Sequence, residues 1–500
     1  MARTLYSTHT AVLRGVVAEP VTVEVSVSSG LPGITIVGMP DAAVLEARYR
    51  VRCAMRACGF ENPRAKITVN LAPSELRKTG TGFDLPIAVA ILACTGQIPT
   101  KGLDDCLFIG ELGLRGEVRS VRGLVAYGML AHEQGLAFVG PHGSIADAHG
   151  QTVIIETLGQ LRQGLSALQP PKPLASLLGE QSSGHMREKD FKEVIDQEVA
   201  KRAFVIAAAG RHGMLMVGPP GAGKSMMAKR MPTILPPLSE QEQAEVLLVH
   251  SVAGQDLLDI QRGRRPFRSP HHAVSKGGLV GGGRPVRPGE ISLAHRGVLF
   301  LDELPEFAPS ALQSLRQPIE DHEVQIVRVD GTYVFPCDFM LVAAANPCPC
   351  GYLGDPDHDC VCSATRIQTY QARIGGPLMD RIDVRVDVAR PSSARIIAGE
   401  QGTPSAEMAK QVQVAREFSS WLMARSGADK PEGSRSIPEL GLDDEAKSML
   451  ETTARRLGLG GRNIVRIARV ARTIANIDES ERVSKDHVVE ACAYRTRATL

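Results

Sequence analysis

The stretch that most constrains the fold of this chain is the octapeptide Gly218-Pro219-Pro220-Gly221-Ala222-Gly223-Lys224-Ser225. It fits G-x-x-x-x-G-K-[ST], the loop that wraps the phosphates of a nucleotide. An apolar run at 214–217 precedes it and a helix-forming run at 226–230 follows, which is the strand–loop–helix order that the motif requires. Glycines let backbone amides turn toward the phosphates, and the helix N-terminus adds the positive end of a dipole. We predict that this loop binds ATP, with Lys224 at the β- and γ-phosphates and Ser225 at magnesium.

A second nucleotide motif follows further along the chain. The run 297–301 is apolar and ends in Asp302 and Glu303. Buried parallel strands are typically continuous apolar runs, and ligands bind beyond their carboxyl ends. The pair alone would equally fit a solvated acidic turn, but the phosphate loop upstream favours a catalytic role. We predict that Asp302 holds magnesium, directly or through water, and that Glu303 is the general base for the attacking water.

Composition limits the class of protein. A length of 500 residues predicts about two to four domains, and 43% hydrophobic residues suffice for sizeable cores. The net charge is only +2, so any nucleic-acid surface must be local. The sequence has no apolar run of about 18 residues and no apolar core of a signal peptide, so we expect no membrane partner and a cytoplasmic location. The ten cysteines are then free or metal-bound.

The sequence predicts a first α/β unit over residues 1–168 and a linker over 169–189. Proline-rich and Ser/Gly-rich composition indicates the linker, although part of it fits an ordered surface loop equally well. Alternating and apolar runs indicate the strands of the first unit, and helices are expected to begin at Asp41 and after Asp84. The expected strands are 21–27, 34–37, 67–71, 107–110 and 137–140.

Two segments of this first unit, 77–84 and 110–124, resemble the proteolytic domain of the Lon family. Lon enzymes use a Ser–Lys dyad. In this sequence Gly82 stands at the position of the serine and Val125 at the position of the lysine. Neither side chain can act as nucleophile or base. The resemblance therefore implies a Lon-like scaffold without peptidase activity, whose role is assembly or the binding of a partner protein.

An ATPase core is expected over 190–390. A basic, glycine-rich segment, the basic insert (263–288), lies between its two nucleotide motifs. Such loops conform to a phosphate backbone and bring positive charge to it, whereas a mobile insert with a solvated basic face is the alternative. The paired histidines His271 and His272 have no cysteines or acids nearby at metal-ligand spacing. The arginines expected to contact nucleic acid are Arg264, Arg265, Arg268, Arg284 and Arg287.

Three elements are expected after the acidic pair. A helix with apolar residues at core spacing covers 308–320. Alternating runs on both sides of Asp330-Gly331 predict a hairpin over 324–335, where Arg328 and Tyr333 either contact nucleic acid or decorate an edge. A buried strand over 339–345 ends in Asn346, which orients the attacking water in ring ATPases or, alternatively, is a turn residue.

A compact cysteine cluster follows this strand. Cys348, Cys350, Cys360 and Cys362 form a C-x-C…C-x-C pattern. Four thiols so close in sequence predict a tetrahedral zinc site, although the spacing within each pair is tighter than usual. His358 is a further candidate ligand.

The last region, 391–500, is expected to be a helical lid. Arginines recur on one of its helices, where they either reach the γ-phosphate across the domain cleft or form a solvated basic face. They are Arg462, Arg466, Arg469 and Arg472. Helical patterns cover 408–422, 443–457, 462–476 and 485–494.

Together, the segments 267–272, 287–295, 302–307 and 346–351 resemble the ComM/YifB family of magnesium-chelatase-like AAA+ ATPases, over essentially the whole chain. The resemblance implies a homo-hexameric ring that migrates DNA branches. It also implies that Arg381 is the arginine finger, Asn346 the sensor asparagine and Arg462 the sensor arginine of the lid. A motor that remodels a protein partner, as the magnesium chelatase subunit does, is the alternative.

Overall fold

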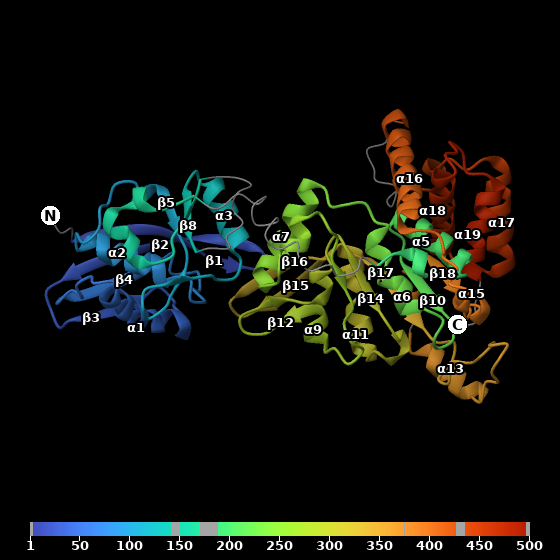
Figure 1. Ribbon diagram of the computed structural model, residues 1–500, viewed down its shortest axis with the longest axis horizontal. Helices are drawn as coiled ribbons and strands as arrows, with labels where there is room; N and C mark the ends of the chain where they lie inside the picture. Colours follow the sequence, from blue (N-terminus) through green and yellow to red (C-terminus); the bar gives the residue numbers. More distant parts are fainter. Residues whose placement is uncertain (1–3, 142–150, 171–188, 375, 427–435, 497–500) are drawn as a thin grey trace.

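The computed structural model describes residues 4–141, 151–170, 189–374, 376–426 and 436–496, with the N-terminal unit at one end of a long axis and the C-terminal helices at the other (Figure 1). The core of the expected linker, 171–188, lies outside the described residues. Within the described part of the chain, no helix is long and apolar enough to cross a membrane.

The N-terminal unit is built on a mixed sheet with the order β3-β4-β2-β1-β5-β8-β9. The expected strands and both helices are present, but the central strand β1 (Leu5–Arg14) was not predicted. Thr8 and Thr10 occupy two of its buried positions, and this hides the apolar alternation that identifies a strand. The other elements are β2 (Val17–Ser28), β3 (Gly33–Val37), β4 (Lys66–Ala72), β5 (Cys106–Phe108), β6 (Glu111–Leu112), β7 (Val118–Arg119), β8 (Ala137–Gly140), β9 (Thr152–Ile154), α1 (Ala42–Ala57), α2 (Asp84–Cys94) and α3 (Leu124–Glu133).

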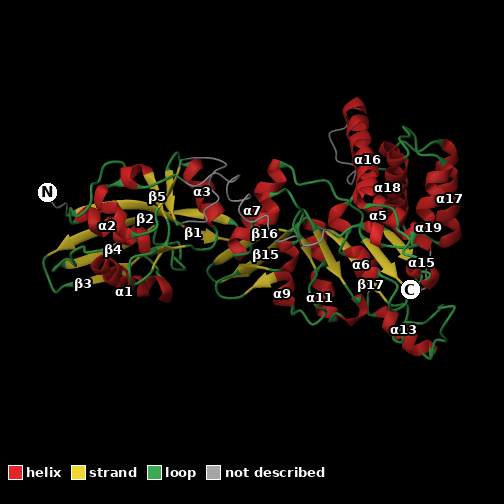
Figure 2. Cartoon of the chain, in the orientation of Figure 1, coloured by secondary structure: helices red, strands yellow, loops and turns green. Residues whose placement is uncertain are grey.

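The central unit holds a second sheet with the order β11-β14-β17-β10-β18, in which every pairing is parallel (Figure 2). All residues of β10 and β14 are buried, as continuous apolar runs predict. The strands are β10 (Met214–Val217), β11 (Phe267–Arg268), β14 (Val298–Leu301), β17 (Met340–Ala345) and β18 (Val384–Asp387). The helices around them include α5 (Glu198–Gly210), α6 (Lys224–Ala228), α7 (Glu240–Ala253), α8 (Leu258–Gln261), α9 (Lys276–Val280), α10 (Glu290–Leu293), α13 (Ala364–Ala372) and α14 (Gly376–Met379).

The single helix expected over 308–320 is wrong in one respect. The structure has two short helices, α11 (Pro309–Ser314) and α12 (Arg316–Asp321). Pro318 has no N–H to donate to the carbonyl of Ser314, so the helix is interrupted between them.

The expected hairpin is present as β15 (Glu323–Arg328) and β16 (Gly331–Pro336), but its turn is one residue earlier. Arg328 pairs with Gly331, so the turn residues are Val329 and Asp330. Gly331 is instead the first residue of the second strand. A glycine is needed at this position because a Cβ would lie 1.6 Å from the guanidinium of Arg14, which belongs to β1. The hairpin thus packs directly against the N-terminal unit.

The C-terminal region is helical, as predicted. Its helices are α15 (Ser393–Ile397), α16 (Ser405–Ser426), α17 (Asp444–Leu457), α18 (Gly461–Ile477) and α19 (Lys485–Thr496). A solvated basic face on α18 is wrong for two of its arginines. Arg472 is buried and donates to Asn476 Oδ1 at 2.9 Å, and Arg466 donates to the carboxylate of Asp383 at 2.9 Å. Both arginines hold the C-terminal region together and onto the central sheet.

Candidate active site

Three neighbouring strands bring the predicted nucleotide residues to one edge of the central sheet. In the parallel register Val217 lies opposite Ala345, and Leu301 lies opposite Ala343. The next residues after these strands therefore meet beyond the same edge, where ligands bind to open α/β sheets. Those residues are Gly218 after β10, Asp302 after β14 and Asn346 after β17.

Lys224 lies inside the phosphate loop and is nearly buried. Its ammonium donates to the carbonyls of Gly218 at 2.7 Å and Pro219 at 2.9 Å, and to Asn346 Oδ1 at 3.1 Å. Burial lowers the pKa of Lys224 to about 8, although the carboxylates of Asp302 and Glu303 act in the opposite direction. The lysine is therefore held at the centre of the site, beside the asparagine expected to position water.

Ser225 and Asp302, which the sequence predicts as the residues that hold magnesium, lie within hydrogen-bond distance of each other. The hydroxyl of Ser225 donates to Asp302 Oδ2 at 2.5 Å. A hydroxyl and a carboxylate oxygen are ligands that magnesium prefers, and the two converge at the mouth of the phosphate loop. These two residues, one on α6 and one directly after β14, therefore fit a magnesium ion.

The backbone turns at Glu303, directly after β14 and Asp302, and the side chain of Glu303 is exposed to solvent. Its φ is 52°, a left-handed conformation that is uncommon for a residue other than glycine, and its side chain is 55% exposed. Its backbone N–H donates to Asp302 Oδ1 at 3.0 Å, which fixes the turn. The carboxylate is therefore accessible to water, which the prediction of a general base requires.

His272 is a site residue that the sequence reasoning missed. It follows β11, the edge strand next to β14, and its Nδ1 lies 3.3 Å from Glu303 Oε2. Its ring also lies beside the ring of His271, with centroids 4.1 Å apart. From the sequence alone, the paired histidines suggest only a metal-binding role. The available signal was their position after an apolar strand that reaches the same edge of the sheet.

Arg381 and Arg462 are not brought to this site within one chain. Arg381 precedes β18 and lies beside Gly213, at the opposite end of β10 from the phosphate loop. The five residue-to-residue steps from Gly213 to Gly218 span about 16 Å of extended strand. Arg381 pairs there with Glu320 of α12. Arg462 is exposed in the first turn of α18.

The basic insert corrects part of the nucleic-acid prediction, because several of its arginines are used within the protein. Arg265 donates to Glu242 at 2.7 Å and to the carbonyl of Arg296, and its side chain is 7% exposed. Arg268 makes a bidentate pair with Glu290 at 2.7 and 2.8 Å. Arg264 pairs with Asp259 at 3.4 Å. These ion pairs engage three of the five arginines expected to contact phosphates.

The cysteine cluster has the shape of a tetrahedral metal site. The Sγ atom of Cys348 lies 3.3 Å from that of Cys350 and 3.7 Å from that of Cys360, and all four sulfur atoms lie within 4.8 Å of one another. Zinc at about 2.3 Å from each of four thiolates places the sulfurs about 3.8 Å apart. A hydrogen bond from the backbone of Tyr352 contributes most to lowering the pKa of Cys350, to about 6. The residues therefore fit zinc, with Cys362 as the fourth ligand.

We predict about one zinc per chain, bound by these thiols. The loop that carries them is largely exposed, with Val361 82% exposed, so a metal supplies the cross-link that a small core cannot. Metal analysis of protein purified without chelator checks this, and Cys360→Ser together with Cys362→Ser should release the zinc. Cys53→Ser, at an exposed cysteine outside the cluster, is the control. Well under one zinc per chain in the wild-type protein would contradict the prediction.

The sheet order and the converging strand ends define a P-loop ATPase of the AAA+ class with an attached helical region. Comparisons with known proteins identify the family. Three family models match consecutive parts of the chain: "Subunit ChlI of Mg-chelatase" over 23–143, "Magnesium chelatase, subunit ChlI" over 190–396, and "Magnesium chelatase, subunit ChlI C-terminal" over 402–495.

Relatives match over nearly the full length. YifB of Escherichia coli and the competence protein ComM of Haemophilus influenzae are each 39% identical, over 97% of this chain and 96% of their own. Lon protease 2 of Bacillus subtilis is 26% identical over 36% of each chain. The chain therefore belongs to the magnesium-chelatase-like AAA+ family that contains YifB and ComM. Membership indicates ATPase activity with ATP and magnesium, and AAA+ proteins are typically oligomeric.

Proposed function

We propose that this protein is a hexameric, ATP-driven motor that translocates on DNA. The observation that carries the proposal is a set of arginines on the insert and the hairpin, Arg284, Arg287 and Arg328, which have no carboxylate partner among the described residues. The two loops pack as one unit, because a Cβ at Gly282 would lie 3.5 Å from Arg328 Nη2. Unpaired arginines on adjoining loops suit the phosphates of a nucleic-acid backbone.

ATP hydrolysis would drive the movement. Lys224 binds the β- and γ-phosphates, Asn346 positions the attacking water, and Glu303 accepts its proton. A magnesium ion held by Ser225 and Asp302 neutralises phosphate charge when it is bound. The carboxylate of Glu303 must break its contact with His272 before it can accept a proton from water. Binding of the nucleotide to the phosphate loop would then be coupled to this movement of Glu303.

In the proposed hexameric ring, Arg381 and Arg462 would act at nucleotide sites although neither lies at the phosphate loop of its own chain. Arg381 lies at the end of the sheet opposite its own phosphate loop, which suits a finger that reaches a neighbour's nucleotide. Arg462, exposed at the start of α18, would be the sensor of the lid. The chain itself would be cytoplasmic, and its proposed domains are those expected from the sequence: 1–168, 190–390 and 391–500.

A second candidate is an ATPase that remodels a protein partner. The family models that match the chain are named for a magnesium chelatase subunit, and this observation favours it. The relative ComM is named a competence protein, and the unpaired arginines favour nucleic acid, so we place the DNA motor first. The N-terminal unit offers a surface for a protein partner in either case.

DNA binding tests the proposal. We expect the wild-type protein to bind forked DNA at low salt with ATP present, and to hydrolyse ATP faster when DNA is added. Replacing Arg284 and Arg287 together by alanine should weaken binding about tenfold or more and abolish most of the stimulation, because phosphate contacts are lost while the nucleotide site is untouched. Fluorescence anisotropy and phosphate release measure the two effects.

The matched control removes two exposed arginines elsewhere, by Arg262→Ala together with Arg456→Ala. This variant carries the same change of net charge, and its DNA binding should stay within about twofold of the wild type. If wild-type protein does not bind DNA at any salt concentration, the motor proposal fails and the remodelling of a protein partner becomes the better reading.

A further inference from the structure

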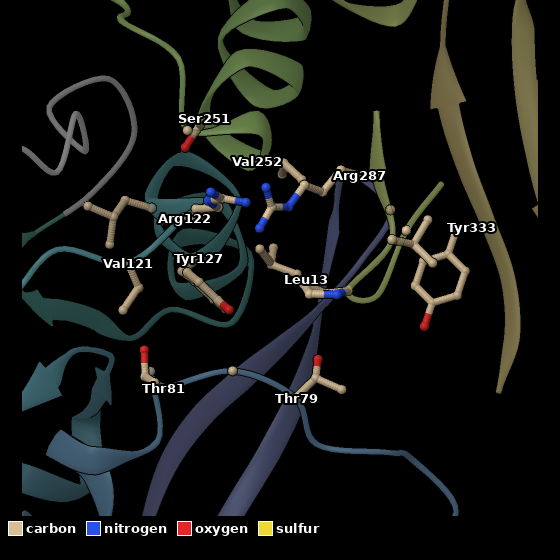
Figure 3. Close-up of a pocket in the computed structure, with 18 of the residues that line it drawn as sticks. Leu13, Thr79, Thr81, Val121, Arg122, Tyr127, Ser251, Val252, Arg287 and Tyr333 are labelled. Atoms are coloured by element: carbon tan, nitrogen blue, oxygen red, sulfur yellow. The ribbon is translucent and has the colours of Figure 1, made fainter. Parts of the chain in front are cut away.

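A large cavity lies between the N-terminal unit and the ATPase core (Figure 3). Its volume is about 1760 Å³, larger than the roughly 300–1,000 Å³ of a small-molecule pocket. One wall comes from the N-terminal unit, with residues around Thr79–Gly82 and Val121–Tyr127. The other comes from the end of α7, the basic insert and the tip of the hairpin. The cavity therefore joins the two units directly at the loops proposed to contact DNA.

The cavity coincides with the position of the missing Lon dyad. Gly82 and Val125, which stand where the Lon resemblance places the serine and the lysine, both line it. The buried ring of Tyr127 lies beside them, and burial raises the pKa of its phenol. The site that a Lon-like protease uses for chemistry is thus retained here as a hollow without a nucleophile and base at those positions.

The arginines and the acids of the cavity differ in how they are paired. The acids are engaged within the protein: Asp41 accepts from the N–H of Val44 at 2.8 Å, Asp256 accepts from the N–H of Leu258, Asp330 accepts from the hydroxyl of Tyr333, and Glu111 accepts from the hydroxyl of Thr81. The arginines have no carboxylate partner in the described part of the chain. They are Arg77 and Arg122 from the N-terminal unit and Arg284, Arg287 and Arg328 from the core.

Two of these arginines approach each other across the domain boundary. Figure 3 shows Arg122 and Arg287 side by side at the cavity wall, and each guanidinium lies in the field of the other. Their repulsion, after burial, lowers the pKa of Arg122. Gly254, at φ 72°, leaves room for Arg122, because a Cβ there would lie 3.1 Å from its Nε. Like charges held together without an acid indicate that an anion is meant to lie between them.

The two walls are fixed relative to each other by hydrogen bonds. The N–H of Gly123 donates to the carbonyl of Ser251 at 3.0 Å, and the N–H of Val125 donates to its hydroxyl at 3.3 Å. On the hairpin side, Arg14 donates to the carbonyl of Asp330 at 3.1 Å. These hydrogen bonds hold α3 of the N-terminal unit against the end of α7, so the two walls of the cavity are held in place without a ligand.

We propose that this cavity binds the phosphate backbone of a single strand of nucleic acid, so that the inactive Lon-like unit forms part of the strand's path. This inference rests on the proposed function and deepens it, because it assigns the N-terminal unit a direct contact with the strand. The arginines of both walls neutralise successive phosphates. Tyr333, on the hairpin wall, offers an aromatic ring on which a base can stack (Figure 3). The size of the cavity suits several nucleotides, not one.

The test uses full-length protein in which Arg77 and Arg122 are both replaced by alanine. Neither arginine belongs to the ATP site or the core loops, and neither has a carboxylate partner among the described residues, so basal ATPase and thermal melting should be unchanged. The probe is fluorescein-labelled oligo(dT) of 30 nucleotides. Each phosphate contact contributes about 0.7 to the slope of log affinity against log salt, so the slope should fall in magnitude by about 1.4. Affinity at low salt should fall about tenfold.

Two further measurements complete the test. Photocrosslinking with 4-thiothymidine-substituted oligo(dT) should label peptides containing 77–82 or 121–127 in wild-type protein. The control variant Arg64→Ala/Arg115→Ala removes two exposed arginines of the same unit that do not line the cavity, and it should keep the wild-type slope.

If the wild-type protein binds oligo(dT) but the Arg77/Arg122 variant keeps the wild-type slope and crosslinks, the inference fails and the motor proposal stands. If the wild-type protein binds no DNA, both fail. Competition by poly-glutamate that depends on Arg77 and Arg122, without DNA binding, would reassign the cavity to an acidic peptide.

Discussion

Glu303→Gln should reduce ATP turnover by about 10²- to 10⁴-fold while nucleotide binding survives. Glutamine keeps the size of the side chain but cannot accept the proton of the attacking water. The phosphate contacts of Lys224 and the ligand pair Ser225 and Asp302 remain, so the affinity for ATP should change little. Steady-state phosphate release measures turnover, and equilibrium binding of a fluorescent ATP analogue measures affinity.

A nearby glutamate provides the matched control. Glu306 lies three residues further along, is exposed, and pairs with Arg373 at 3.6 Å outside the nucleotide site. Glu306→Gln removes the same charge from the same turn, and its turnover should stay within about threefold of the wild type. Near-normal turnover by Glu303→Gln, or an equal loss in both variants, would show that Glu303 is not the base.

The contact between Glu303 and His272 means that the carboxylate has to move before it can act as the base. His272 Nδ1 and Glu303 Oε2 are 3.3 Å apart, so the carboxylate contacts the histidine. A base must be within hydrogen-bond reach of the proton it removes, so Glu303 has to turn away from the histidine before hydrolysis. The exposure of its side chain leaves room for this rotation.

The sequence predicted the parts of the site that are local in the chain. The phosphate loop and the acidic pair are recognisable because each is a short motif directly after an apolar strand. The cysteine cluster is also local, and its compact geometry agrees with the spacing. The central strand β1 was missed because buried threonines interrupt its apolar alternation. Thr8 finds its hydrogen-bond partner only in the folded protein, where it donates to the carbonyl of Pro86 in α2.

The arginines of the insert show what sequence alone does not contain. Arg265 and Arg268 look like Arg284 and Arg287, since all are arginines among glycines and prolines. They differ in having carboxylates within reach, Glu242 on α7 and Glu290 on α10, and this pairing is set by tertiary structure. The same reasoning applies to His272, whose partner Glu303 follows the neighbouring strand β14. Charge counts along the chain therefore overestimate the cationic surface that is free for a ligand.

Arg381→Ala should reduce ATP turnover by about 10³-fold, a loss comparable to that of other arginine fingers. Glu320→Ala is the matched control, because it breaks the same ion pair but leaves the arginine in place. Its turnover should stay within a few-fold of the wild type. Equal losses in both variants would mean that the ion pair, and not a finger, explains the effect.

Mixing experiments then decide whether Arg381 acts on a neighbouring subunit. Arg381→Ala subunits keep an intact phosphate loop, and Lys224→Ala subunits keep the arginine, so each lacks what the other supplies. In a randomly mixed ring at equal amounts, about a quarter of the interfaces join an intact loop to an intact arginine, and the mixture should regain up to about a quarter of wild-type turnover. Both pure variants should be nearly inactive. Since Arg381 lies at the far end of the sheet from its own phosphate loop, recovery is the outcome that this geometry requires. The absence of recovery at any mixing ratio would place Arg381 in its own subunit's structure and remove it from the catalytic site.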